Sequence, residues 1–162
     1  MNCFHLVFTG GEPFMFNGFI DLLEYVRVNN FTFDVYTNGL ILFENFDLAL
    51  KLSKLLPKCI YISLYGSDAK IHDNITQTHG SFYKTLELLQ VLKNLEIPTV
   101  LNITLMKQNI NDFPRIIELI HSIDIQYRIG LSMTRRNNGD ITPLNYFIND
   151  KRLVKNVLQH ES

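Results

Sequence analysis

Residues 9–14 read TGGEPF, between the apolar run HLVF at 5–8 and a segment, FNGFIDLLEYV at 16–26, that has the spacing of an amphipathic helix. Gly10 and Gly11 leave main-chain amides and carbonyls open to close approach, and Pro13 fixes the direction in which the chain leaves the strand. Glu12 is the only charge held at this strand end. Gly-Gly after a strand is by itself more often a simple turn, so the rest of the chain must decide.

The remaining sequence alternates short β-rich runs with helical patterns. Strands are predicted at about 5–9, 31–37, 59–66, 99–106 and 125–133. The first two helices are predicted from a cap at Asn17, with Phe19, Leu22, Leu23 and Val26 on one face, and over 45–56, with Leu48, Leu52 and Leu55 aligned. A third is capped by Ser81, with Leu88, Val91, Leu92 and Leu95, and a fourth by Asp112, with Phe113, Ile116, Ile117 and Ile120.

This alternation predicts an α/β fold with a parallel sheet. A polar stretch at 67–80 separates the third strand from its helix, and a last helix is expected near Asn149. Right-handed crossovers leave two architectures, an open doubly wound sheet or an arc of a β/α barrel.

Composition excludes several classes of protein. The 162 residues carry 15 basic and 16 acidic side chains, a net charge of −1, which argues against a nucleic-acid binder that uses a basic face. No apolar run approaches the roughly 20 residues of a membrane span, and the start, MNCFHLVF, is a poor signal peptide. We therefore expect a cytoplasmic protein, in which a disulfide between Cys3 and Cys59 is not favoured.

Polar residues gather where the predicted strands end. The first strand end supplies Gly10, Gly11, Glu12 and Pro13; the others supply Thr37 and Asn38, then Ser63 and Tyr65, then Asn102, Thr104, Lys107 and Asn109, then Ser132, Thr134 and Arg135. Ligands of parallel α/β folds bind at the carboxyl ends of the strands. A rim of neutral hydrogen-bonding groups with one carboxylate suits an ammonium group better than a phosphate.

Other ligand and catalytic motifs are missing or weak. There is no GxGxxG, no GxxxxGK followed by Ser or Thr, and no GxSxG. His72-Asp73 could imitate part of a catalytic triad without a nucleophile nearby, and His72 and His79 could bind a metal only through loop folding, so both readings are disfavoured. Ser63 and Asn102 could equally be core or strand-edge polar groups; their shared location with the other strand ends favours a site.

Five ordered segments resemble the radical S-adenosylmethionine (SAM) enzymes: FTGGEPF, YTNG, ISLYGSDAKIHDNITQTHGSF, LNITLMKQN and the tail LSMTRRNNGDITPLNYF. The tail is similar to that of peptide maturases that carry a C-terminal SPASM extension. The resemblance implies a partial (β/α)6 barrel of the TIM type, in which a 4Fe-4S cluster and SAM produce a 5′-deoxyadenosyl radical that abstracts hydrogen from a peptide or protein.

The same resemblance implies roles for individual residues. Gly10, Gly11 and Glu12, followed by Pro13, match the motif that holds the methionyl amino group of SAM. Thr37 and Asn38 match a second position lining that pocket, and Ser63 matches a position that contacts the carboxylate or ribose. Asn102 and Thr104 match positions facing the ribose and adenosine.

Two features depart from the family pattern. The cluster motif CxxxCxxC, which the family carries before GGEP, is not in this sequence, and Thr76 stands near a position where many relatives have arginine. No cysteine follows Cys59, whereas SPASM extensions are cysteine-rich. We therefore expect residues 1–148 to be an incomplete barrel with about five of six strands, 149–162 to be a helix or tail leading toward an extension, and the isolated chain to be a catalytically inactive fragment.

Two alternatives stay open at this point. The chain could be a degenerate, non-catalytic half-barrel that docks a complementary, cysteine-bearing chain, or a small flavodoxin-like ligand-binding domain unrelated to SAM. Co-purification with such a chain would favour the first alternative, and the lack of any relation to SAM would favour the second.

Overall fold

The structure is a computed structural model that describes residues 4–131, 139–149 and 155. The chain divides into two compact units. Unit 1 comprises Met1–Ser63 and Tyr83–Leu101, and unit 2 comprises Leu64–Phe82 and Asn102–Ser162. The two units are described separately below.

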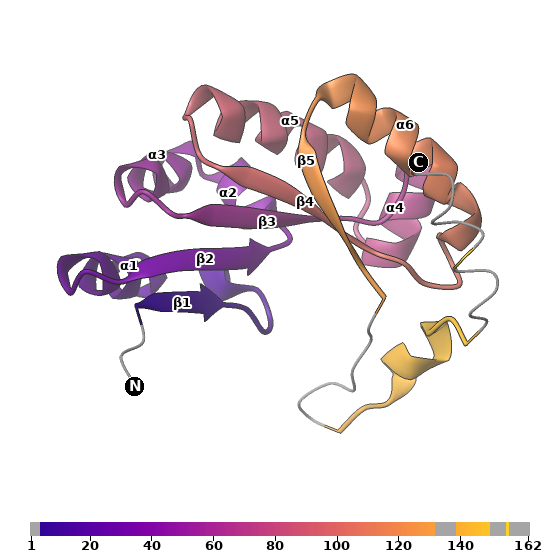
Figure 1. Cartoon of the computed structure of the whole chain (residues 1–162), viewed down its shortest axis with the longest axis horizontal. Helices are drawn as coiled ribbons and strands as arrows, with labels where there is room; N and C mark the ends of the chain where they lie inside the picture. Colours follow the sequence, from indigo (N-terminus) through magenta and orange to yellow (C-terminus); the bar gives the residue numbers. More distant parts are fainter. Residues whose placement is uncertain (1–3, 132–138, 150–154, 156–162) are drawn as a thin grey trace. The chain divides into compact units, whose positions relative to one another are not determined.

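The strands are β1 (His5–Phe8), β2 (Thr32–Thr37), β3 (Cys59–Leu64), β4 (Thr99–Thr104) and β5 (Gln126–Gly130), in the sheet order β1-β2-β3-β4-β5 (Figure 1). β1 pairs with β2 in parallel, with Val7 opposite Asp34. β2 pairs with β3 in parallel, with Tyr36 opposite Tyr61. Sequential strands that neighbour one another, joined by helices, confirm the predicted α/β class. The five strands begin within one residue of their predicted starts. β2 ends at the predicted residue, and the other four strands end one to three residues early.

The two faces of the unit 1 strands differ in burial. Along β2 and β3 the alternate residues are buried, namely Phe33, Val35, Thr37, Ile60, Ile62 and Leu64. The residues between them, among them Asp34, Tyr36 and Tyr61, are half-buried. Because successive side chains of a strand point to opposite faces, one face forms the core and the other stays partly open.

Unit 1 also contains η1 (Pro13–Met15), α1 (Phe19–Val28), α2 (Leu40–Glu44), α3 (Phe46–Lys54) and most of α5 (Ser81–Asn94). Of the predicted core residues of α1, Phe19, Leu23 and Val26 are buried, but Leu22 is 39% exposed. Gly18, not Asn17, precedes the helix, because its φ of +95° favours glycine.

The second helical region differs from its prediction. Asn45 does cap α3, since its Oδ1 accepts a hydrogen bond from the Leu48 amide at 3.1 Å. Of the three leucines predicted to align, Leu52 is buried, whereas Leu48 and Leu55 are half-buried; Ala49 is buried as well. The preceding short helix α2 was not predicted, because Asn38-Gly39 is typical of a turn; here Gly39, at φ +81°, is the N-cap.

The start of α5 shows another difference. Leu88 and Leu92 are buried as predicted, whereas Val91 and Leu95 are half-buried and Leu89 joins the core. Ser81 is the first residue of the helix and is itself buried. The amides of the first turn are capped from a distance by Asp73, as described below.

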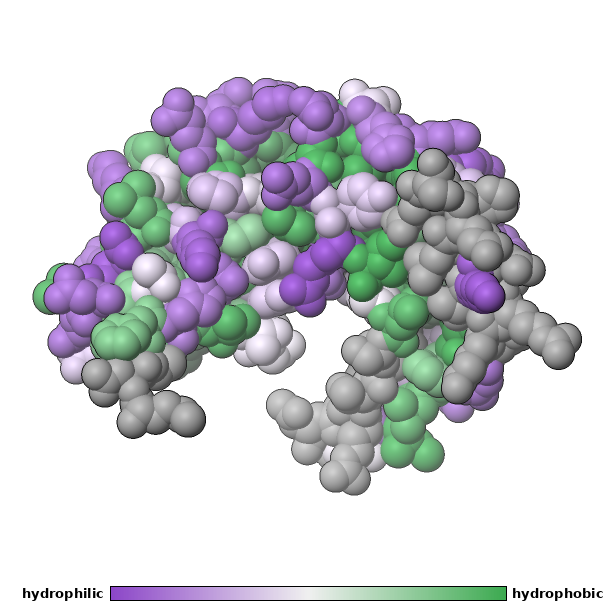
Figure 2. Space-filling view, viewed as in Figure 1, coloured by the Kyte–Doolittle hydropathy of each residue, from purple (hydrophilic) through white to green (hydrophobic). Residues whose placement is uncertain are grey.

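Unit 2 contains α4 (Ala69–Thr76), η2 (Ile110–Asp112), α6 (Phe113–Ile123) and η3 (Thr142–Tyr146). The predicted buried face of α6 is confirmed: Phe113, Ile116, Ile117 and Ile120 are buried, and a proline occupies its first turn. The outer surface of α6 is mostly hydrophilic in Figure 2.

The polar stretch at 67–80 contains the helix α4, which the sequence did not predict. Its start is capped by Asp68, whose Oδ1 accepts from the Ile71 amide at 2.9 Å, and His72 is its one buried residue. With so few apolar residues the segment lacks the pattern that indicates a helix.

Some predictions fall on residues outside the described ranges. These are Cys3, the end of the predicted fifth strand at Ser132 and Met133, the rim residues Thr134 and Arg135, and the helix predicted from Asn149 onward. In the described part of the chain, no helix has the length and apolar content to cross a membrane.

Candidate functional site

The Glu12 carboxylate is held by three donors at the end of β1. Its Oε1 accepts from the Thr37 hydroxyl at 2.6 Å and from the Phe14 amide at 3.2 Å. Its Oε2 accepts from the Asn38 amide at 2.8 Å. The structure therefore brings together Glu12, Thr37 and Asn38, which the sequence placed at two successive strand ends.

Thr37 connects this carboxylate to the start of the next helix. Its side chain is buried, and its hydroxyl accepts from the Gly39 amide at 3.0 Å while donating to Glu12. Asn38 is exposed, and its Oδ1 accepts from the Leu40 amide at 2.9 Å. Because Gly39 adopts a left-handed conformation, Thr37 and Asn38 can each donate a hydrogen bond to Glu12 and accept one from an amide at the start of α2.

The two glycines before Glu12 border open space. Both are exposed, Gly10 has a φ of +129°, and a Cβ atom built on either would meet nothing within 4 Å. Pro13 begins η1 and turns the chain away. A half-buried carboxylate beside uncovered backbone fits an ammonium group, which needs acceptors from several directions.

The other predicted site residues lie on β3 and β4. Ser63 lies on β3, half-buried, on the same strand face as Cys59 and Tyr61. Asn102 and Thr104 belong to unit 2 on β4, both half-buried. The Asn102 Oδ1 accepts from Arg128 Nε of β5 at 2.9 Å.

His72 and Asp73 have structural roles. The His72 ring is buried, accepts the Tyr65 amide at Nδ1 (3.2 Å), and packs against Tyr65 and Phe82. Burial lowers its pKa to about 4, although the neighbouring Asp73 acts in the opposite direction.

Asp73 holds the start of α5. Its carboxylate accepts from the amides of Gly80 (2.6 Å) and Phe82 (2.9 Å) and from the Ser81 hydroxyl (3.0 Å). Burial acts to raise the pKa of Asp73, but these hydrogen bonds and nearby His72 lower it overall. The hydrogen bonds of His72 and Asp73 thus stabilise the fold, in agreement with the expectation that they do not form part of a catalytic triad.

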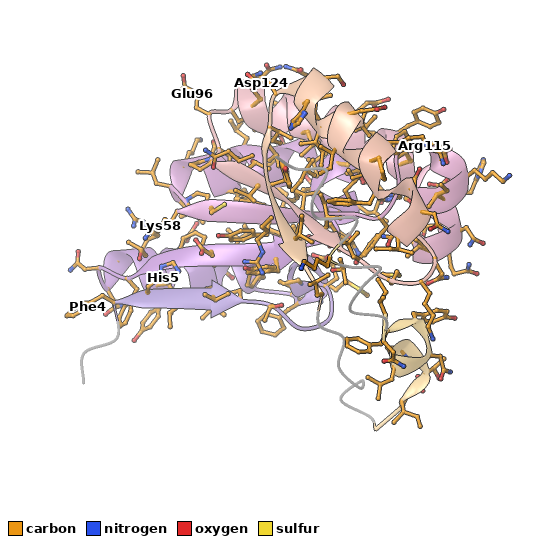
Figure 3. The ribbon with its side chains drawn as sticks, turned by 45° about the vertical axis from the view of Figure 1, so that its right-hand side comes forward. Phe4, His5, Lys58, Glu96, Arg115 and Asp124 are labelled. Carbon is orange, nitrogen blue, oxygen red and sulfur yellow. The ribbon has the colours of Figure 1, made fainter. Side chains whose placement is uncertain are left out.

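Sequence reasoning missed the roles of two further polar residues of unit 2. Asn109 is fully buried; it donates to the carbonyls of Tyr65 (3.1 Å) and Thr104 (3.0 Å) and accepts from the Met106 amide (2.8 Å). Asp112 was predicted as a helix cap, but its carboxylate instead accepts from Ser67 and pairs with Arg115 at 2.8 Å (Figure 3). Polar residues between apolar ones, as in KQNIND, were the available signal.

The described residues offer few metal ligands. Cys59 on β3 is a half-buried cysteine. Across the residues that the structure describes, no group of three or more His, Cys, Asp or Glu side chains could hold a metal ion. The described residues do not fit the thiolate ligand set of an iron–sulfur cluster.

The fold is that of an α/β protein, and its candidate ligand site lies at the carboxyl ends of β1 and β2. The model of the radical SAM superfamily matches residues 2–120, and the chain belongs to this superfamily. This membership confirms the fold expected from the resemblance. It also confirms, for the family, the expected cofactors SAM and a 4Fe-4S cluster, and it disfavours a flavodoxin-like domain unrelated to SAM.

Several relatives match over most of this chain. An AdoMet-dependent heme synthase of Methanosarcina barkeri is 27% identical over 114 residues, 70% of this chain and 32% of the relative. A PqqA peptide cyclase of Rhodopseudomonas palustris is 27% identical over 117 residues, 72% of this chain and 30% of the relative. The chain thus spans about a third of the length of these relatives.

Solved structures show the same fold. The structure titled as native anSMEcpe with bound AdoMet and Kp18Cys peptide has a TM-score of 0.68 at 16% identity, covering 96% of this chain and 46% of that one. A domain of pyruvate-formate lyase-activating enzyme from Bacteroides vulgatus has a TM-score of 0.68 at 14% identity, covering 94% of this chain and 89% of that domain.

Proposed function

We propose that the protein to which this chain belongs is a radical SAM enzyme in which Glu12 binds the methionyl ammonium group of SAM. The observation that carries the proposal is the fixed Glu12 carboxylate beside the open backbone of Gly10 and Gly11. The radical chemistry that SAM and a 4Fe-4S cluster would supply in the whole enzyme needs cluster ligands that the described residues do not provide.

The hydrogen-bond capacity of Glu12 supports this role. An ionised carboxylate can accept about four hydrogen bonds, and Glu12 accepts three from the chain itself. At least one position remains for a ligand N–H, and a bond between two charged groups is about twice as strong as a neutral one. The Gly10 and Gly11 carbonyls are further candidate acceptors. Pro13 sets the exit of the loop, while Ser63, Asn102 and Thr104 stay predicted as positions for the carboxylate, ribose and adenosine.

We propose a peptide or protein as the substrate. Two comparisons support this class: the PqqA peptide cyclase among the relatives, and anSMEcpe with a bound peptide among the solved structures. The resemblance of the tail to SPASM-type peptide maturases points the same way.

We also propose that these 162 residues alone do not cleave SAM reductively. The support is that the described ranges hold no set of thiolates for a cluster. The isolated chain is then expected to bind SAM weakly, through contacts with protein groups and without coordination to a cluster.

NMR titration of the ¹⁵N-labelled chain tests the Glu12 role, because it detects millimolar binding residue by residue. SAM is expected to shift the amides of Gly10, Gly11 and Asn38. 5′-Methylthioadenosine, which lacks the amino and carboxylate groups, should leave these amides nearly unchanged.

Glu12→Gln should weaken SAM binding at least tenfold, and Glu24→Gln, which changes an exposed carboxylate of α1, should not. The assignment fails if both ligands shift the Gly10 and Gly11 amides equally, or if the two variants behave alike. The alternative of a non-catalytic partner of a cysteine-bearing chain stays a prediction, tested by co-purification from the native organism.

A further inference from the structure

An unusual carboxylate lies on the partly open face of the unit 1 strands. Asp34 on β2 is 13% exposed, and its Oδ2 lies 3.2 Å from Nε2 of His5 on β1. Figure 3 labels His5 at the start of that strand. The other oxygen, Oδ1, is buried and has no hydrogen-bond partner within the described parts of the chain.

A buried oxygen without a donor calls for an explanation, since such groups are nearly always hydrogen-bonded in folded proteins. His5 serves Oδ2 with one ring nitrogen, and its Nδ1 lies 2.8 Å from the Thr32 hydroxyl. The ring is therefore held between two partners. A carboxylate with an unused oxygen is best satisfied by a charged N–H donor.

Two aromatic rings lie beside this carboxylate along the strands. Asp34 pairs in register with Cys59, and two residues further along Tyr36 pairs with Tyr61. Residues two apart on a strand share a face. The two tyrosine rings stack with their centroids 4.3 Å apart and their planes 9° from parallel.

Aromatic faces carry negative potential and attract cations. Burial, followed by the proximity of Cys59 and Asp34, raises the pKa of Tyr61. That direction fits a shielded environment of negative charge, in which the phenol stays protonated at neutral pH. Carboxylate and rings together form a surface that favours an organic cation.

We propose that Asp34, Tyr36 and Tyr61 form a subsite for a positively charged organic group of the substrate, an ammonium or a guanidinium. A metal ion fits less well, because no group of three or more ligating side chains occurs in the described ranges. Tyr36 is two residues from Asn38, roughly 7 Å along the strand, so the subsite lies within reach of a ligand held at Glu12. That the cation belongs to the substrate rests on the proposed function.

The test is a titration of the full chain, carrying ¹³C-labelled tyrosine, with N-ethylguanidinium and with n-butylammonium at constant ionic strength. N-ethylurea, similar in shape to the first probe but neutral, is the control ligand. Either cation is expected to give saturable shifts of the Tyr36 and Tyr61 ring signals, and N-ethylurea is expected to give none.

Variants test whether Asp34 is responsible for the binding. Asp34→Asn keeps the size of the side chain and should weaken cation binding at least tenfold, whereas Glu24→Gln, at an exposed carboxylate of α1, should leave it unchanged. Tyr61→Leu, expected to weaken binding severalfold, replaces Asp34→Asn if that variant does not fold.

The proposal is overturned if neither cation gives a saturable shift, if N-ethylurea shifts the rings equally, or if Asp34→Asn binds like the wild type. SAM binding is measured in a separate titration. Its failure with retained cation binding would count against the proposed function and not against the subsite.

Discussion

The buried His72 makes a quantitative prediction about stability and pH. Its Nδ1 accepts the Tyr65 amide, so this nitrogen must be unprotonated in the folded protein. Protonation would place a second hydrogen against that donor and a charge among aromatic rings. Burial accordingly lowers the pKa of His72 from 6.5 to about 4.

The sign follows from proton binding. Between pH 6.5 and 4 the unfolded chain binds a proton at His72 and the folded chain does not, so the free energy of unfolding decreases as the pH falls. One pKa unit is worth about 1.4 kcal/mol, so the loss is about 2 kcal/mol at pH 5 and about 3 kcal/mol at pH 4. The full contribution is present above pH 6.5.

Urea unfolding followed by circular dichroism, at several values between pH 7.5 and 5, measures this loss. His72→Asn is the matched variant, because its side-chain oxygen can accept the Tyr65 amide but does not titrate. The wild type should lose about 2 kcal/mol more than the variant over this range. Parallel curves for the two proteins, or a His72 pKa near 6.5 measured by NMR, would refute the reasoning.

Four other substitutions have outcomes set by the contacts described. Asn109→Ala removes three hydrogen bonds to backbone groups and should lower the free energy of unfolding by about 3 kcal/mol, at roughly 1 kcal/mol per hydrogen bond. Gly39→Ala should cost at least about 1–2 kcal/mol in the same assay, because φ is +81° and the new Cβ would meet a leucine methyl at 2.5 Å. Asp73→Ala should cost about 1–2 kcal/mol through the lost cap, seen as early amide exchange at the start of α5. Lys84→Met should cost under about 1 kcal/mol despite the 2.7 Å contact of Lys84 with Glu44, because the pair is at the surface; a larger loss in urea unfolding would contradict this.

Much of the fold was predictable because hydrophobic periodicity is a local property. The stripe of α6 was correct residue by residue, since its four core positions recur at helical spacing. The helices α2 and α4 escaped prediction for a different reason. Their starts depend on Gly39 and Asp68, which sequence patterns also assign to turns, and each helix buries only one side chain.

The candidate site was predictable in outline only. The sequence predicted that Glu12 lies near Thr37 and Asn38, because neighbouring parallel strands have their carboxyl ends at the same edge of the sheet. Which atoms bond to the carboxylate depends on the path of the chain after each strand. The roles of Asp73 and Asn109 were not predicted, because a polar residue in a sequence does not show which backbone groups it will bond. Asp73 bonds to residues 80–82, and Asn109 bonds to residues 65, 104 and 106.

The three bonds to Glu12 have a consequence for the thermodynamics of ligand capture. A free glutamate side chain loses up to about 2 kcal/mol of rotamer entropy when it is immobilised. Here Thr37, Asn38 and Phe14 immobilise it when the protein folds. The Glu12 side chain is therefore already fixed in one rotamer before an ammonium group binds. Calorimetry should show a smaller entropic penalty for binding than a freely rotating carboxylate would impose.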